Sequence, residues 1–195
     1  VTISGNNLVV ALVLTMCASL VLGMGLPTAA SYILVATLTA PALVNMGVDL
    51  MAAHMFVFYS AMLSAITPPV ALAAFAAAAI CREPPMRVAI ISVKFGFVAF
   101  VLPYFFVLEP RLLAEGGLLE VLEMFALATI AILAIVCAIQ GYAFSRLSLI
   151  ERLILPFAAF ALLIPGTFIT SIGVMTLLAM AIFWKFGRSV GEAGT

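Results

Sequence analysis

Two short segments of the sequence combine helix-breaking residues with small oxygen-bearing side chains. The first is Gly-Met-Gly-Leu-Pro-Thr at residues 23–28, followed by Ser31, and the second is Ser-Ala-Ile-Thr-Pro-Pro at residues 64–69. Hydroxyl groups and unwound carbonyls suit a hard cation such as sodium, and the N-terminus of a half-helix attracts an anionic group. These residue types therefore indicate binding of a cation and an anion.

Patterns typical of other chemistry are missing from the sequence. It has no His-Glu-x-x-His motif, no paired acids at mid-membrane and no serine with a base partner, so an intramembrane enzyme is disfavoured. The three cysteines form no Cys-x-x-Cys pair, and we expect them to be packing residues. His54 is expected to be a packed or interfacial residue, with a proton relay as the alternative.

The composition is that of a membrane protein. Hydrophobic residues make up 67% of the 195 residues, and charged residues only 8%. A soluble domain needs more charge at its surface, so we predict an all-α polytopic membrane protein in contact with lipid. Eight basic and eight acidic residues cancel, so no net charge indicates a nucleic-acid partner.

The first apolar run, residues 8–43, is too long for one membrane span. It is interrupted in the middle by Gly23, Gly25 and Pro27. Each half has about 15 residues and reaches about 22 Å, which is short of a hydrocarbon core of about 30 Å. We therefore predict a re-entrant helical hairpin.

A second interrupted run covers residues 51–80. Pro68 and Pro69 lack amide hydrogens and push the residues before them out of the helical region, so the helix must open there. The run is predicted to be a discontinuous transmembrane helix. Ordinary spans are predicted for residues 87–108 and 120–144.

The last apolar stretch, residues 153–183, is broken at Pro165 and Gly166 into either a hairpin or a kinked span. Basic residues fall in three connecting segments, whereas acidic residues dominate the loop at residues 109–120. By the positive-inside rule the basic segments are cytoplasmic and the acidic loop is external, and this alternation favours the hairpin. The basic residues used are Arg82, Arg87, Arg146, Arg152, Lys185 and Arg188.

Two interruptions in succession are the arrangement with which secondary transporters bind their substrates. Irregular backbone inside a membrane is tolerated only where protein or a watery cavity satisfies its polar groups. The breaks at residues 23–28 and 64–69 are therefore expected to approach each other in a permease that works by alternating access. The alternative is a scaffold or assembly subunit without a transport site, in which the breaks lie apart and only shape packing.

The residues around both breaks also resemble a known family. The segments are Gly-Met-Gly-Leu-Pro-Thr-Ala-Ala-Ser-Tyr at residues 23–32, Ala-His-Met-Phe-Val-Phe-Tyr at residues 53–59 and Leu-Ser-Ala-Ile-Thr-Pro-Pro-Val-Ala at residues 63–71. They are similar to the large permease subunit of TRAP (tripartite ATP-independent periplasmic) transporters, and most of all to fused permeases that work with TAXI-type binding proteins. The resemblance is specific over residues 8–80 and weaker beyond them.

The resemblance implies an elevator-type importer in the inner membrane of a bacterium or archaeon, with sodium as coupling ion and no other cofactor. It implies organic anions, such as carboxylates, delivered by a periplasmic solute-binding protein, and a small permease subunit or fused equivalent as partner. Residues 1–108 would be the second-repeat part of the transport domain, one half of an inverted repeat. Residues 109–195 would be a C-terminal membrane extension, and this C-terminal fragment alone is not expected to transport.

The same resemblance implies the site residues. Sodium would be held, largely through backbone carbonyls, at Gly23, Gly25, Ser64 and Thr67. The substrate would be bound at Pro27, Thr28, Ser31, Thr67 and Pro68.

Overall fold

The computed structural model describes residues 7–143, 146–164 and 166–187. Every regular element among these residues is a helix, and Tyr142 and Arg146 form only an isolated β-bridge. The chain divides into two compact units, residues 1–113 and 114–195, which are described separately. The division lies slightly beyond residue 108, because the short 3-10 helix η1 (Pro110–Leu113) packs on helices of unit 1.

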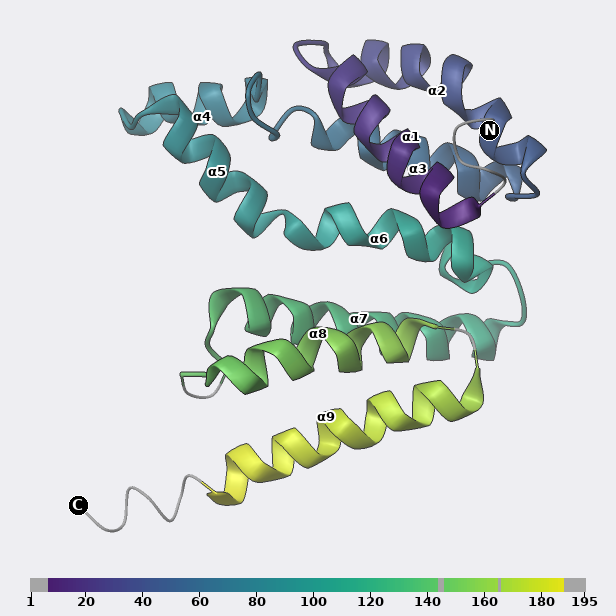
Figure 1. Ribbon diagram of the computed structural model, residues 1–195, viewed down its shortest axis with the longest axis vertical. Helices are drawn as coiled ribbons and strands as arrows, with labels where there is room; N and C mark the ends of the chain where they lie inside the picture. Colours follow the sequence, from purple (N-terminus) through teal and green to yellow (C-terminus); the bar gives the residue numbers. More distant parts are fainter. Residues whose placement is uncertain (1–6, 144–145, 165, 188–195) are drawn as a thin grey trace. The chain divides into compact units, whose positions relative to one another are not determined.

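Unit 1 begins with two helices, α1 (Leu8–Gly23) and α2 (Thr28–Asn45), joined by a short turn (Figure 1). Asn7 caps α1 by accepting a hydrogen bond from the Val10 amide at 3.2 Å. The 18 residues of α2 correspond to about 27 Å, more than the predicted half-helix, because Pro41 lies inside the helix and does not end it. A helix of this length could nearly cross the hydrocarbon core, so its length does not show that α2 is re-entrant. The re-entrant hairpin stays a prediction.

The predicted discontinuous helix consists of α3 (Leu50–Leu63) and α4 (Leu72–Cys81). Asp49 caps α3 through hydrogen bonds from the Met51 and Ala52 amides at 2.7 and 3.2 Å. Residues 64–71 between the helices contain the two prolines and form no regular helix. The interruption is thus confirmed at the predicted place.

The single span predicted for residues 87–108 is wrong in its continuity. The structure has two helices, α5 (Pro85–Phe95) and α6 (Phe97–Leu108), bent by 42° at Gly96. A tertiary contact accompanies this bend, since a Cβ on Gly96 would lie 2.8 Å from Cδ1 of Ile66 in the break. The bend therefore lies at a glycine, where the Ile66 side chain takes the space that a larger residue would need.

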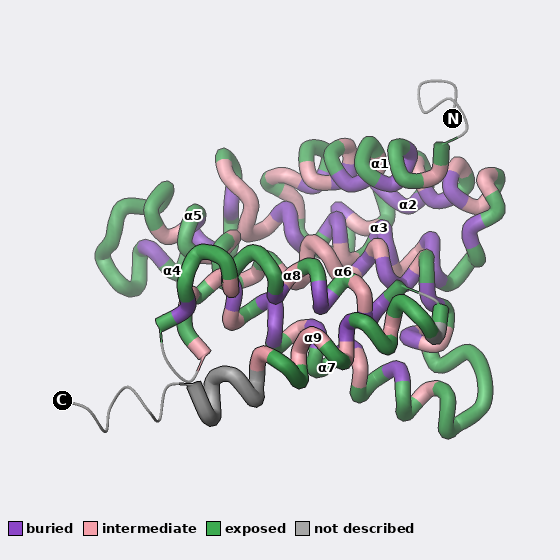
Figure 2. Tube along the Cα trace, turned by 60° about the horizontal axis from the view of Figure 1, so that its bottom comes forward, coloured by how far each residue is buried: buried purple, intermediate pink, exposed green. Residues whose placement is uncertain are grey.

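The core of unit 1 lies between α1, α2, α3 and α6, whose inward faces are buried (Figure 2). Phe56 of α3 is fully buried and meets Tyr104 of α6 edge to face, with ring centroids 5.2 Å apart. A separate small core, formed by Ala71, Ala74 and Ala89, holds α4 against α5. The α4–α5 pair is thus packed mainly on itself.

Unit 2 consists of α7 (Leu118–Gln140), α8 (Leu149–Leu163) and α9 (Thr167–Gly187), with α8 packed on both neighbours. Arg152 donates to the carbonyls of Ala138 and Ile139 at 2.9 and 3.3 Å and so caps the C-terminus of α7. A Cβ on Gly173 would lie 2.9 Å from the Ala158 carbonyl oxygen, so α8 and α9 are in close contact. They pack together as a helical hairpin, and a turn of residues 153–183 within the membrane stays a prediction.

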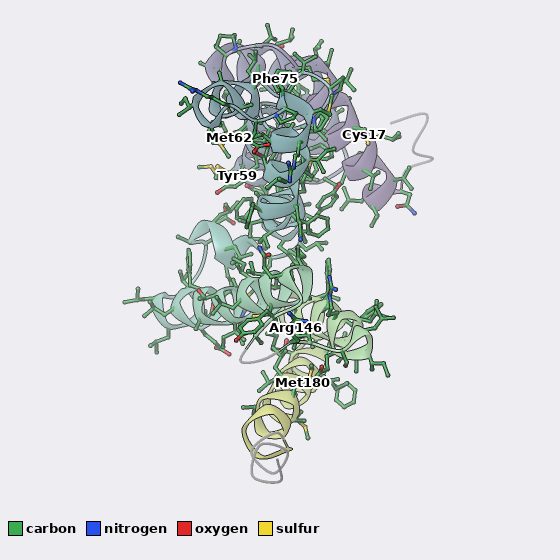
Figure 3. All side chains as sticks on the ribbon, turned by 90° about the vertical axis from the view of Figure 1, so that its left-hand side faces the viewer. Cys17, Tyr59, Met62, Phe75, Arg146 and Met180 are labelled. Atoms are coloured by element: carbon green, nitrogen blue, oxygen red, sulfur yellow. The ribbon has the colours of Figure 1, made fainter. Side chains whose placement is uncertain are left out.

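Two helices of the described residues, α2 and α7, are long and apolar enough to cross a membrane, and the bent α5–α6 pair makes a third if it is one span. Large apolar side chains are exposed on most helices, and the projecting sticks are nearly all carbon (Figure 3). Such an exterior suits lipid and not water. The fold is the predicted all-α polytopic membrane protein. The sequence also predicts an interfacial anchor at Trp184, Lys185 and Arg188, which lies outside the described side chains.

The positive-inside assignment predicts an external loop at residues 109–120 and a cytoplasmic turn between α7 and α8. Gly116 has a φ of 127°, which would strain a cysteine there, so exposed Glu115 is the better labelling site. With all native cysteines of the complete permease replaced by alanine, Glu115→Cys should react with a membrane-impermeant maleimide on intact cells. Leu149→Cys should react only after the membrane is opened, and the reverse pattern would overturn the topology.

Candidate functional site

The hairpin turn and the helix break meet at Gly23, the last residue of α1. A Cβ on Gly23 would lie 2.5 Å from Oγ of Ser31 in α2 and 2.6 Å from Oγ of Ser64 in the break. Both serines are buried, with 0% and 1% exposure. The prediction that residues 23–28 and 64–69 approach each other is confirmed, and it requires a residue without a side chain at position 23.

One carbonyl ties the two elements together. Ser64 Oγ donates to the Ala61 carbonyl oxygen at 2.6 Å, and Ser31 Oγ donates to the same oxygen at 3.5 Å. The second distance is at the outer limit for a hydrogen bond, so the first bond is the stronger. Ala61 was not a predicted site residue, because nothing in its side chain signals that its carbonyl lies at the end of a helix.

After α3 the chain continues as a tightened turn before the helical hydrogen bonds end. The amides of residues 64–67 bond carbonyls three residues back, at 3.1 to 3.3 Å, and the Ala73 amide closes the loop onto the Ala65 carbonyl at 2.9 Å. No donor among the described residues reaches the carbonyls of residues 66–69. At the hairpin turn the Gly23 carbonyl accepts from the Leu26 amide at 3.3 Å, and the Gly25 carbonyl has no donor among the described residues. Carbonyl oxygens are thus free in both segments.

The two discontinuous elements share a pattern of capping. Each starts with a capped helix, at Asn7 and Asp49, and resumes with a helix that has no side-chain cap, at Pro27 and Ala71. The first-turn amides of α2 and α4 therefore mostly lack acceptors, and these helix ends carry partial positive charge. A Cβ on Gly25 would lie 3.6 Å from Val70, so the two uncapped ends lie close to each other.

One prediction about Thr67 is wrong. Because Thr67 stands beside Pro68 where the helix must open, the sequence predicts that its hydroxyl has no helical partner. In the structure this hydroxyl donates to the Leu63 carbonyl at 2.7 Å. Thr129 in the regular helix α7 makes the same bond to the Phe125 carbonyl at 2.8 Å. The helical hydrogen bond persists because residues 64–67 still follow a tightened turn. The Thr67 oxygen keeps a lone pair that can coordinate a cation.

The other predicted residues differ in accessibility. Pro27 and Thr28 are exposed at the start of α2, and Pro68 is half-buried in the break. Ser31, predicted to bind substrate, is fully buried within the helix contact and does not lie on an open surface. Gly25 is exposed and has a φ of 78°, a conformation that favours glycine. The structure thus brings Gly23, Ser31 and Ser64 together, with the remaining residues around them.

His54 has a partner that sequence reasoning did not identify. The Tyr32 hydroxyl and His54 Nδ1 are 2.9 Å apart and link α2 to α3. This contact agrees with the expectation of a packed histidine. The described residues hold no cluster of three His, Cys, Asp or Glu side chains that suits a metal ion. Any cation at the breaks would therefore have hydroxyl and carbonyl oxygens as ligands.

A membrane protein in which a helical hairpin and a discontinuous helix meet at their interruptions has the architecture of a secondary transporter. Residues 1–114 match the family model of the tripartite ATP-independent periplasmic transporter, DctM component. The match covers more than half of the 195 residues, so the chain belongs to this family and is part of a TRAP large permease. The comparisons with curated proteins and with solved structures give no match.

The contact at Gly23 predicts the effect of a single methyl group. In an open helical position Gly→Ala stabilises a protein, because it restricts the unfolded chain. At Gly23 the methyl group would overlap both serine hydroxyls, so Gly23→Ala should lower the free energy of unfolding by about 1–3 kcal/mol. Thermal unfolding of the purified permease in detergent measures the loss.

Ala126→Ser is the control, since it also adds one heavy atom but on an exposed face of α7. Its melting temperature should stay at the wild-type value. If Gly23→Ala melts at or above the wild-type temperature, the close contact at the hairpin turn is wrong.

Proposed function

We propose that this chain supplies one half of the transport site of a sodium-coupled importer of organic anions, carboxylates among them. In this proposal a periplasmic solute-binding protein delivers the anion, and a small permease subunit or a fused equivalent completes the assembly. The transporter works in the inner membrane of a bacterium or archaeon. Membership of the TRAP family supports the general scheme, and the geometry of the two breaks supports the sodium and anion sites.

The observation that carries the proposal is the meeting of two unwound segments that both offer free carbonyl oxygens. Sodium is a hard cation that prefers oxygen ligands, and discontinuous helices of transporters coordinate it with such carbonyls. Gly25 offers a carbonyl on the hairpin side, and residues 66–69 offer carbonyls on the other side. The Thr67 hydroxyl adds a side-chain oxygen to the same segment.

The uncapped helix ends support an anionic substrate. Free amides in the first turns of α2 and α4 are donors for carboxylate oxygens, and the helix dipoles favour negative charge there. Thr28 is exposed at the first of these ends and adds a hydroxyl. A cation held by the carbonyls would also attract the anion, so the two ligands would bind cooperatively. Such mutual stabilisation is a physical basis for coupled import.

The proposal includes the topology inferred from the basic residues. The hairpin of α1 and α2 enters from the external face and turns back at residues 24–27, and the break in α3–α4 lies at the same depth. The competing scaffold hypothesis requires interruptions that lie apart and are sealed by packing. The close approach at Gly23 and the membership of a transporter family both speak against that hypothesis.

The sodium site is tested by a matched pair of threonines. Thr67 and Thr129 lose the same type of helical hydrogen bond when replaced by valine, so the bond itself cancels in the comparison. In the complete permease, Thr67→Val should raise the sodium concentration for half-maximal uptake about tenfold, the effect of losing about 1.4 kcal/mol of binding. Thr129→Val should leave this concentration unchanged.

The measurement is substrate uptake by reconstituted permease across a sodium titration, with the amount of inserted protein as control. Equal half-saturation in the wild type and Thr67→Val removes this side chain from the site. Uptake by the wild type that is the same in sodium and in potassium removes sodium coupling altogether.

A further inference from the structure

The unwound segment at residues 64–71 makes a second contact that is independent of the hairpin. Ile66, in the middle of this segment, packs on Gly96, where α5 and α6 meet at an angle of 42°. A Cβ at Gly96 would lie 2.8 Å from Ile66 Cδ1 and 3.2 Å from the Ser92 carbonyl oxygen. The Ile66 side chain therefore occupies the space that any larger residue at position 96 would take.

This contact lies where the α4–α5 pair joins the rest of unit 1. That pair has its own small core, and its connections to the body are residues 64–71 on one side and Gly96 on the other. The two connections touch each other through Ile66 (Figure 1 shows α4 and α5 extending together away from α1 and α3). The α5–α6 bend is therefore in direct contact with the segment that carries the free carbonyls.

We propose that Ile66 and Gly96 form a positioning pair, which holds the unwound segment against the hairpin turn so that its carbonyls face the cation. This inference rests on the proposed sodium site but concerns two positions whose side chains do not bind the ion. Ile66 has an apolar side chain, and Gly96 has none, so neither side chain can bind sodium. Their effect acts through the placement of the carbonyls of residues 66–69.

A methyl group at position 96 would displace a side chain without unfolding a helix. The atom nearest to the new Cβ is the far end of a flexible side chain, so Gly96→Ala is accommodated by moving Ile66. Ile66 lies outside the helices, in the tightened turn that follows α3, so the displacement shifts the unwound segment and not a helix. Adding Ile66→Ala to Gly96→Ala removes the collision with the Ile66 side chain. The methyl group at position 96 then fills part of the space that the Ile66 side chain has left.

The test is a double-mutant cycle in the complete permease. Gly96→Ala and Ile66→Ala should each raise the sodium concentration for half-maximal uptake about threefold or more, while the maximal rate per inserted protein changes less. The double variant should lie below the product of the two single effects. Ile90→Ala, at an exposed position on α5, is the control and should behave as wild type.

A second readout follows the segment without relying on transport. Val70 is half-exposed beside Gly25, so the rate at which Val70→Cys reacts with a maleimide in proteoliposomes reports the place of the segment. Gly96→Ala should change this rate, and adding Ile66→Ala should return it toward the original value. If Gly96→Ala does not insert, Ile66→Ala alone must still change the rate.

The outcomes separate this inference from the proposed function. Single effects that multiply in the double variant, or a Val70→Cys rate that no variant changes, overturn the positioning pair. Loss of sodium dependence in the wild type overturns the sodium site, and the modification rates then still decide whether Ile66 and Gly96 position the segment.

Discussion

Inside a bilayer, a peptide group that leaves a helix must find its hydrogen-bond partner in the protein or in a water-filled cavity. This constraint organises unit 1. The hairpin of α1 and α2 and the discontinuous helix of α3 and α4 both expose irregular backbone, and their two interruptions meet at Gly23. The contact depends on the smallest residue, because Oγ atoms from two other segments lie only 2.5 and 2.6 Å from where its Cβ would be. Unit 1 is thus held together where its two interrupted elements are least regular.

The two breaks leave the same kinds of backbone group without hydrogen bonds. The helices before the breaks, α1 and α3, are capped by Asn7 and Asp49, whereas α2 and α4, which follow the breaks, have no side-chain cap. Carbonyls in the same two segments have no donors among the described residues. A cation on the carbonyls and an anion on the amides would complete both sets at once. The groups that cost most to leave unpaired would then be the ones that recognise the transported species.

The sequence predicted those features of the fold that single residues determine. Glycine and proline located both interruptions, because proline removes an amide and pushes the residue before it out of the helical region. The features it did not provide depend on the exact course of the chain around a proline or on tertiary contacts. Pro41 lies within α2 without ending it, the bend at Gly96 depends on Ile66 from another segment, and Thr67 keeps a helical bond because the break unwinds gradually. Glu109 was counted as a loop acid, but it is buried and paired with Arg111. Periodicity and composition carry no record of such partners.

The central claim is that residues 23–31 and 64–74 form one ligand site, and amide hydrogen exchange in the complete permease tests it most directly. Amides without acceptors exchange quickly, and a ligand that occupies them or orders their surroundings slows that exchange. Sodium together with substrate should protect both segments with the same concentration dependence, relative to potassium at equal ionic strength. Exchange in α7, which belongs to unit 2, should be unchanged. Protection of only one segment, or of neither, would contradict a shared site.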